Sequence, residues 1–288
     1  MEREADSRPS NSSSSSSTGS LPPYPLEDMD LAPTLGREYS ITPEDPYAFL
    51  EHFDTAFLID DSAAMEKYWG EVSALLGSIA PICTERDPDG IDIYFVNHHP
   101  RGYYMYAALG LDQDRSGYKH IGQATGSLAM CDNVAGIFNR VKPHGKCKLG
   151  HRLSYILNRY VRDYAWSAQR AGHTGPIVKP LNLIVISAGD TDDNPNDTLI
   201  HTAKKLDELE APEYQLGIQF FQIGDSEAGR QAMEFADDTL AEAMGFRDMI
   251  DTVTWSGDKP GELTPEAVLK VVLGAVHRSI DKHTNKHG

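Results

Sequence analysis

The chain has 288 residues, of which 40% are hydrophobic and 24% charged, so it can bury one substantial core. Its formal net charge of -17 argues against nucleic-acid and anionic-membrane partners, because both are bound by clustered Lys and Arg that displace counterions. A basic protein or a cation suits this charge better, unless the acidity serves only to keep the chain soluble.

Cysteine usage and the N-terminal pattern point to the cell interior. No stretch approaches the ~20 apolar residues of a membrane helix, and the N-terminus lacks a basic-then-apolar secretory pattern. Cys83, Cys131 and Cys147 form neither a C-x-x-C pair nor an even disulfide framework. We therefore expect a cytoplasmic protein, with the nucleus as the alternative compartment.

Residues 1–40 have the composition of a disordered tail. Asn11 is followed by six consecutive serines, and the segment 21–25 is rich in proline. Such a stretch buries too little apolar surface to offset its ordering entropy. We expect one globular domain over residues 45–284, preceded by this tail.

Two alternating patterns run through the domain. Runs rich in β-branched and aromatic residues predict strands at 57–59, 91–96, 181–189, 216–223 and 250–255, with 103–106 and 118–121 as candidates for an edge strand. Apolar residues at helical spacing predict a short helix from Thr42 and longer ones over 66–79, ending at Pro81, and over 127–141, 151–170, 197–209, 227–244 and 264–282. We expect Trp166 and Trp255 in the core. Strands that alternate with helices pair in parallel, so the predicted fold is α/β, a three-layer doubly wound sandwich with a Rossmann-like, mostly parallel sheet.

The stretch 53–65 contains the most informative pattern in the sequence. Its apolar run over 57–59 ends in Asp60, Asp61 and Ser62, and a helical pattern follows. Ligands bind at the carboxyl ends of strands in open α/β sheets, so these polar side chains mark a candidate site. The stretch resembles the first strand of the von Willebrand factor A (vWA) domain, which ends in Asp-x-Ser-x-Ser.

The resemblance covers about residues 45–282 and is strongest to the intracellular fungal type of vWA protein. The segments that carry it are 57–62, 87–95, 214–224 and 248–253. It implies a vWA fold and a metal ion-dependent adhesion site (MIDAS), in which five side chains from three loops hold a divalent cation. Mg²⁺ prefers hard oxygen ligands in a near-octahedral shell, with one position left for a partner's carboxylate.

The match to these five ligand positions is partial. Asp60 and Ser62 fit the first two, whereas Ala64, Cys147 and Ala188 stand at the other three. Alanine offers the ion nothing, and a thiol is a soft ligand that suits Mg²⁺ poorly. We therefore predict a degenerate MIDAS and no bound cofactor.

The loop that carries the fourth position is basic. Lys146 and Lys148 would repel a cation there. With His144 and His151 they form a candidate pocket for an acidic group, because backbone donors at a helix N-terminus attract anions. The segment 145–150 lacks the residue order of a nucleotide-binding P-loop.

Other carboxylates offer an alternative that keeps the metal. Asp61 and Asp190, followed by Asp192 and Asp193, supply oxygen ligands for Mg²⁺ or Mn²⁺ if the loop after the fourth major strand is shifted. The simpler interpretation is that acidic loop residues are solvated or cap a helix, as Asp197 is expected to do.

We expect this protein to bind a partner rather than to catalyse a reaction. Cys147 beside His144 or His151 is a candidate nucleophile, but a cysteine in a threonine position is more simply inert. The candidate binding residues are Asp60, Asp61, Ser62, Lys146, Cys147, Lys148 and Asp190. The expected function is a non-catalytic vWA-type protein–protein interaction module. The alternatives are a vWA domain that still binds Mg²⁺ or Mn²⁺ and a hydrolase on a Rossmann-like sheet.

Overall fold

A six-stranded sheet forms the centre of the molecule. The computed structural model describes residues 47–87, 89–100, 116–122, 134–170, 178–239 and 247–255, together with Gly245 and Val272. The strands are β1 (Asp54–Ile59), β2 (Ile91–Phe95), β3 (Tyr118–Ile121), β4 (Leu181–Ser187), β5 (Leu216–Ile223) and β6 (Ile250–Trp255). The predicted tail 1–40, the strand candidate 103–106 and, apart from Val272, the helix 264–282 lie outside the described residues.

The strand order is β3-β2-β1-β4-β5-β6. β2, β1, β4, β5 and β6 pair in parallel, and β3 pairs antiparallel with β2 at the edge. The chain winds outward from β1 to β3 and then returns to β4, from which it winds outward to the other edge. The predicted α/β architecture with a mostly parallel, Rossmann-like sheet is confirmed. The reversal between β1 and β4 marks the place where such sheets bind ligands.

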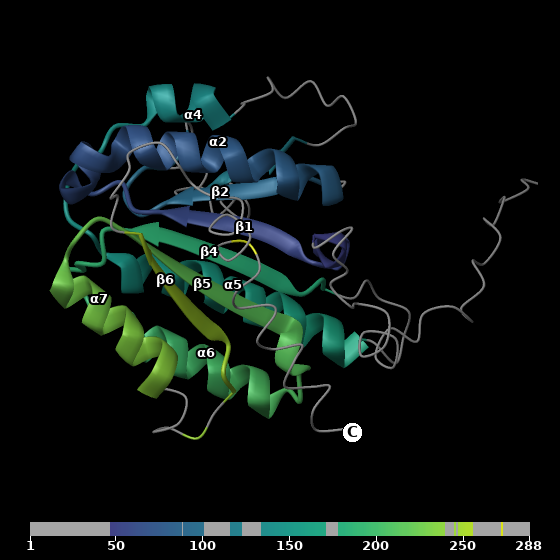
Figure 1. Cartoon of the computed structure of the whole chain (residues 1–288). Coiled ribbons are helices and arrows are strands. Elements are labelled where there is room, and N and C mark those ends of the chain that lie inside the picture. Colours follow the sequence, from purple (N-terminus) through teal and green to yellow (C-terminus); the bar gives the residue numbers. More distant parts are fainter. Residues whose placement is uncertain are drawn as a thin grey trace, which may run out of the picture.

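Helices cover both faces of the sheet (Figure 1). α2 (Trp69–Arg86) and α4 (Val134–Arg140) lie on one face, and α5 (Leu149–Arg170), α6 (Asn196–Glu208) and α7 (Glu227–Glu234) lie on the other. Short helical turns complete the described elements: η2 (Ala48–His52), η3 (Ala63–Tyr68), η5 (Glu213–Gln215) and the π-helical turn η6 (Phe235–Thr239). No described helix combines the length and the apolar character needed to cross a bilayer.

Two apolar layers, one on each face of the sheet, form the core. In β1, Phe57 and Ile59 pack into the layer under α2, whereas Ala56 and Leu58 pack into the layer under α5. Side chains alternate between the faces of a strand, so a strand covered on both faces is apolar at successive positions. β4 and β5 are buried at every residue for this reason.

The helix end predicted at Pro81 is wrong. α2 continues through Pro81 to Arg86. An interior proline removes one helical hydrogen bond and costs about 3 kcal/mol. Beyond the proline, Cys83 is fully buried in the core, and its carbonyl accepts a hydrogen bond from the Asp87 N–H at 2.9 Å. Burial of Cys83 offsets part of the cost of the proline.

The prediction that Trp166 belongs to the core is also wrong. Its side chain is 52% exposed, and the Arg170 guanidinium lies 3.8 Å from its ring centroid. α5 has 22 residues, which extend over about 33 Å, whereas the seven residues of β4 extend over about 23 Å. The end of the helix therefore reaches beyond the apolar face that it covers. Trp255 is half-buried and packs against the core, as predicted.

A backbone contact between Gly189 and Gly229 seats α7 against the loop after β4. A Cβ atom added at Gly229 would lie 2.7 Å from the Gly189 Cα and carbonyl carbon. Backbone atoms cannot give way as the end of a flexible side chain can, so this contact requires glycine. The contact brings the start of α7 next to the candidate site.

We predict that Gly229→Ala destabilises the protein by about 1–3 kcal/mol, because the methyl group overpacks this contact. Gly77→Ala, in α2, is the matched control. A Cβ at Gly77 meets no atom within 4 Å, so the substitution should stabilise by about 0.5–1 kcal/mol through helix propensity alone. Urea denaturation of the two variants measures both effects. Equal stabilisation by the two substitutions would contradict the proposed close approach.

Candidate functional site

The candidate site lies at the carboxyl ends of β1 and β4, where the winding of the sheet reverses. It is built from the loop at 60–62, the loop at 142–148 that precedes α5, and the loop at 187–193 that follows β4. The sequence predicted that these three loops meet, and hydrogen bonds between them join all three.

Asp60 is fully buried at the end of β1. Its Oδ1 accepts a hydrogen bond from the Ser62 N–H at 2.8 Å, and its Oδ2 accepts one from the Ser187 hydroxyl at 3.0 Å. The Ser187 oxygen in turn accepts from the Gly189 N–H at 3.1 Å. Both carboxylate oxygens of Asp60 therefore have protein donors, and one of these bonds ties β1 to the loop after β4.

Asp61 is also fully buried, but its side chain is directed to the end of β2. Oδ1 accepts from the Asn97 N–H at 2.7 Å, and Oδ2 accepts from the His98 N–H at 2.9 Å. The Asp61 carbonyl accepts from the His144 N–H at 2.7 Å. Burial raises the pKa of Asp61 to about 6, against the lowering effect of the two N–H donors. Asp61 thus links the end of β1 to the residues that follow β2 and to the loop that contains His144.

Asn97 completes the connection between the loop at 142–148 and the sheet. Its side-chain amide donates to the carbonyl oxygens of His144 at 2.8 Å and Lys146 at 3.1 Å. Sequence reasoning did not identify Asn97 or Ser187, although both directly follow or end an apolar strand run. A polar residue at the end of an apolar run is the sequence pattern that could have identified both.

Cys147 points into the site from the loop before α5. The residue is buried, and its thiol lies beside Asp60 and Ser187. Burial, followed by the charge of Asp60, raises the pKa of the Cys147 thiol well above its usual range. The protonated thiol is a poor nucleophile and a poor ligand for a hard cation.

The loop after β4 uses its carboxylates to hold its neighbours. Asp192 Oδ2 accepts from the Cys147 N–H at 2.9 Å, and its Oδ1 lies 3.2 Å from the Lys146 ammonium. Asp190 is exposed and accepts from the Ser226 hydroxyl at 2.8 Å. Lys148 is exposed beside this loop. The Lys146–Asp192 ion pair therefore links the two loops of the charged rim.

Asp193 caps the N-terminus of α5. Its Oδ1 accepts from the Gly150 N–H at 2.9 Å, and its Oδ2 accepts from the His151 N–H at 2.8 Å. A carboxylate is favoured there by the unpaired N–H groups and by the helix dipole. The anion-binding position predicted for an external acidic group is occupied by Asp193. By contrast, the expected cap Asp197 lies in the first turn of α6, whose N-cap is Pro195 and has no side-chain cap bond.

The donors at this edge do not fit a Mg²⁺ shell. Asp60 has both oxygens engaged, Cys147 offers a protonated thiol, and Ala64 and Ala188 offer no ligand atom. The Ser62 hydroxyl is buried without a hydrogen-bond partner in the described part of the chain. Mg²⁺ keeps several waters but is usually held by one or two carboxylates, and every described carboxylate at this edge, from Asp60 to Asp193, already accepts a hydrogen bond from the protein.

An acidic group at the opposite end of β1 has the geometry of a cation site. Among the described residues, only Asp54, Asp87 and Asp89 bring three acidic, His or Cys ligand atoms within 4.8 Å of one another. The Lys179 ammonium lies 3.4, 3.3 and 3.1 Å from these three carboxyl groups. An internal cation therefore already neutralises part of their charge.

Comparisons with known proteins give little beyond this geometry. No family model matches the chain, and no curated protein matches it. Among solved structures, the pilus adhesin SpaC from Lactobacillus rhamnosus GG, in an open conformation, shares 11% identity over 80% of this chain and 30% of the adhesin, with a TM-score of 0.39. Proximal thread matrix protein 1 from the mussel byssus shares 14% identity over 81% of this chain and 48% of that protein, with a TM-score of 0.37. The chain thus spans less than half of either structure, and neither similarity carries an argument about its function.

We predict a pH-dependent contribution of Asp61 to stability. In an unfolded chain the pKa of Asp is near 3.9, and in the folded protein that of Asp61 is about 6. Between these two pKa values the folded protein holds a proton on Asp61 that the unfolded chain releases. The stabilising contribution of this proton is therefore fully present below about pH 4 and is lost as pH rises through 6. The free energy of unfolding of the wild type, relative to Asp61→Asn, should fall by about 2–3 kcal/mol between pH 4 and 7.

Urea denaturation across this pH range measures the difference. Gly77→Ala changes no ionisable group and is the control, so its difference from the wild type should be nearly constant with pH. If the difference in free energy of unfolding between the wild type and Asp61→Asn did not change with pH, the N–H donors, and not burial, would dominate the pKa of Asp61.

We predict that Cys147 is inert in the folded protein. The thiolate is the reactive form, and burial beside Asp60 disfavours it. Iodoacetamide should therefore alkylate Cys147 at least about 100-fold more slowly than free cysteine at neutral pH. Peptide mass spectrometry reports the rate at this residue, and the urea-unfolded chain, in which Cys147 should react at the ordinary rate, is the control. Alkylation as fast as that of free cysteine would restore the thiol-enzyme alternative.

Proposed function

We propose that this protein is a non-catalytic protein–protein interaction module of the vWA type that acts inside the cell. It binds a protein partner through the loops at the carboxyl ends of β1 and β4, and a metal ion takes no part in the contact. The buried, free thiols of Cys83 and Cys147 suit a reducing compartment, which supports the intracellular part of the proposal.

The observation that carries the proposal is the closed hydrogen bonding of Asp60. The positions that the vWA resemblance assigns to three loops converge at one sheet edge, as a MIDAS requires. There, however, the central carboxylate accepts from Ser62 and Ser187, at 2.8 and 3.0 Å, and the cysteine thiol lies beside it. In this proposal the arrangement of the three loops is that of a MIDAS, whereas the oxygen atoms that would bind a cation accept hydrogen bonds from the protein.

Recognition then depends on the rim of the site. His144, Lys146 and Lys148 on one loop and Asp190 and Asp192 on the other are exposed. Such mixed, partly paired charges set orientation and specificity at protein interfaces more than they add affinity. The two rim lysines fit a partner that presents carboxylates, the same group that a MIDAS cation would otherwise bind.

A metal-dependent contact is the competing function, and the unpartnered hydroxyl of Ser62 is the observation that favours it. Titration calorimetry with Mg²⁺ and with Mn²⁺ separates the two. We expect no saturable binding below about 1 mM, because Mg²⁺ is usually held by one or two carboxylates and those beside the Ser62 hydroxyl are already engaged by protein donors. Sub-millimolar binding that Asp60→Asn abolishes would overturn the metal-independent proposal.

Affinity capture from cell extract, with the full chain as bait, tests the interaction itself. We expect the captured proteins to be the same with and without EDTA. Lys148→Glu should lose them, because it reverses a rim charge. Lys204→Glu, which reverses an equally exposed charge on α6, should retain them. Loss of the partners in EDTA, or equal capture by both variants, would contradict the proposed surface.

A further inference from the structure

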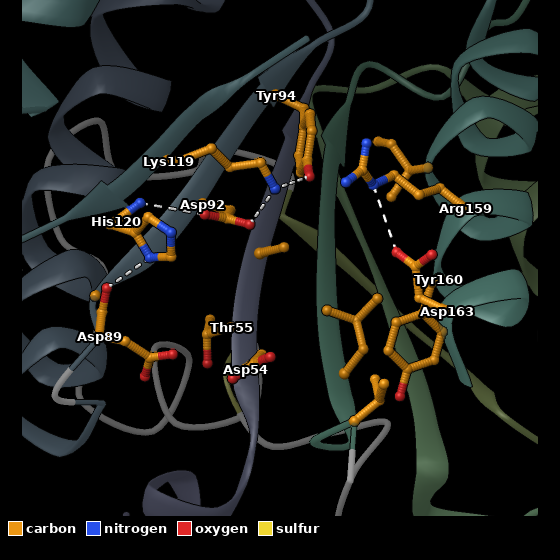
Figure 2. Close-up of a pocket in the computed structure, with 15 residues that line it drawn as sticks. Asp54, Thr55, Asp89, Asp92, Tyr94, Lys119, His120, Arg159, Tyr160 and Asp163 are labelled. Atoms are coloured by element: carbon orange, nitrogen blue, oxygen red, sulfur yellow. Dashed lines mark hydrogen bonds and ion pairs between the residues drawn. The ribbon is translucent and has the colours of Figure 1, made fainter. Parts of the chain in front are cut away.

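A second cavity lies at the other end of the sheet from the candidate site. It has a volume of about 260 Å³ and lies on the face covered by α5 (Figure 2). It begins at Asp54, the first residue of β1, whereas Asp60 follows the last. Six residues of strand separate the two by about 20 Å. This cavity, called the α5 pocket below, is therefore a separate feature.

The α5 pocket has two polar walls and an apolar base. Arg159 and Asp163 project from α5 on one side, and Asp92, Lys119 and His120 project from β2 and β3 on the other (Figure 2). The apolar and aromatic side chains that line the pocket are Ala56, Tyr94, Ile156, Tyr160, Val178 and Leu181. An apolar chain with polar ends is the ligand shape that such a lining accepts.

The cations that line the pocket are matched by carboxylates. The Lys119 ammonium contacts Asp92 at 2.5 Å and also bonds the Tyr94 hydroxyl. Arg159 lies 3.6 Å from Asp163. Each of these positive charges already faces a negative one, so the pocket offers no excess positive charge to an anionic ligand.

At the start of β1, by contrast, carboxylates outnumber the positive charges. Asp54 and Asp89 line the pocket and share the Lys179 ammonium with the buried Asp87. Burial raises the pKa of Asp87, and the hydrogen bond from Asp87 holds the pKa of Asp89 below its usual range. Even with Asp87 protonated, two carboxylates face one ammonium, so this end of the pocket carries an excess negative charge.

Asp54 is the side chain that an added cation would help most. Its side chain is 46% exposed, while its Oδ1 is covered and contacts the Lys179 ammonium at 3.4 Å in an ion pair. Burial raises the pKa of Asp54, which means that its charge is incompletely compensated. A donor cation in the pocket would hydrogen-bond the exposed part of this carboxylate and favour its ionised form.

We propose that the α5 pocket binds a small organic cation, with an amino or guanidino group on a short apolar chain. The cationic group lies against Asp54 and Asp89, and the chain lies along Ile156 and Leu181. The volume is below the roughly 300–1,000 Å³ of sites for drug-sized ligands, so the ligand is a small one. This site is independent of the proposed protein-binding loops.

Agmatine, a guanidinium and an ammonium on a four-carbon chain, is the probe. Titrated into the full chain at low salt and followed by NMR, it should bind saturably below about 10 mM, the range expected for so few heavy atoms. Glutarate, a dianion of similar length, should not bind. Asp54→Asn and Asp89→Asn should each weaken agmatine binding about tenfold or more, since each removes a charge-assisted hydrogen-bond acceptor.

Asp238→Asn is the matched control, because it removes one exposed carboxylate in η6, directly after α7, and should leave binding unchanged. If Asp54→Asn does not fold, Asp89→Asn decides the test, since its side chain is 48% exposed in a turn. No saturable agmatine binding, equal binding of glutarate, or equal loss in Asp238→Asn would overturn the proposal. Each outcome is independent of EDTA and of Lys148, so failure here leaves the proposed interaction module standing.

Discussion

Burial of two adjacent carboxyl groups at the end of β1 is the constraint around which this edge of the sheet is organised. Asp60 and Asp61 are both excluded from solvent. A buried carboxylate that lacks donors is destabilising by several kcal/mol. The donors come from separate loops, with Ser187 serving Asp60, and Asn97 and His98 serving Asp61. Each bond that satisfies a carboxylate also fixes a loop, so the shape of the rim follows from the solvation of these two side chains.

The described fold was largely predictable because its strands are covered on both faces. β5 has the predicted bounds, since a mostly apolar run marks a strand that is buried at every residue. β6 also has them, although it lies at the edge and is only partly buried, because β-branched and aromatic residues mark it. β3 was only a candidate, because its four residues lie at the edge and none is buried. Pro81 and Trp166 were misjudged for a shared reason. The local pattern at each was clear, but the outcome depended on how far the helix extends along the sheet.

The roles of the site residues were less predictable than their meeting place. Topology brings the three loops together, yet the function of each carboxylate depends on partners far along the chain. Asp61 bonds residues 36 and 37 positions away, and Asp193 bonds residues 43 and 42 positions away. An aspartate that caps a helix and one that binds a metal have the same residue type in the same kind of loop. Only the positions of the donors distinguish them.

The two ends of β1 stabilise their carboxyl groups in different ways. At the amino end, Asp54 relies on the Lys179 ammonium, which it shares, so charge is left over for a ligand. At the carboxyl end, Asp60 relies on an N–H group and a hydroxyl, which are fixed by the fold and carry no net charge. A cation bound by open carboxylates would give a partner one strong, removable contact. With those carboxylates bonded to protein donors, the loop geometry does not depend on a cation, and in the proposed function affinity for a partner would come from the summed weak contacts of the rim.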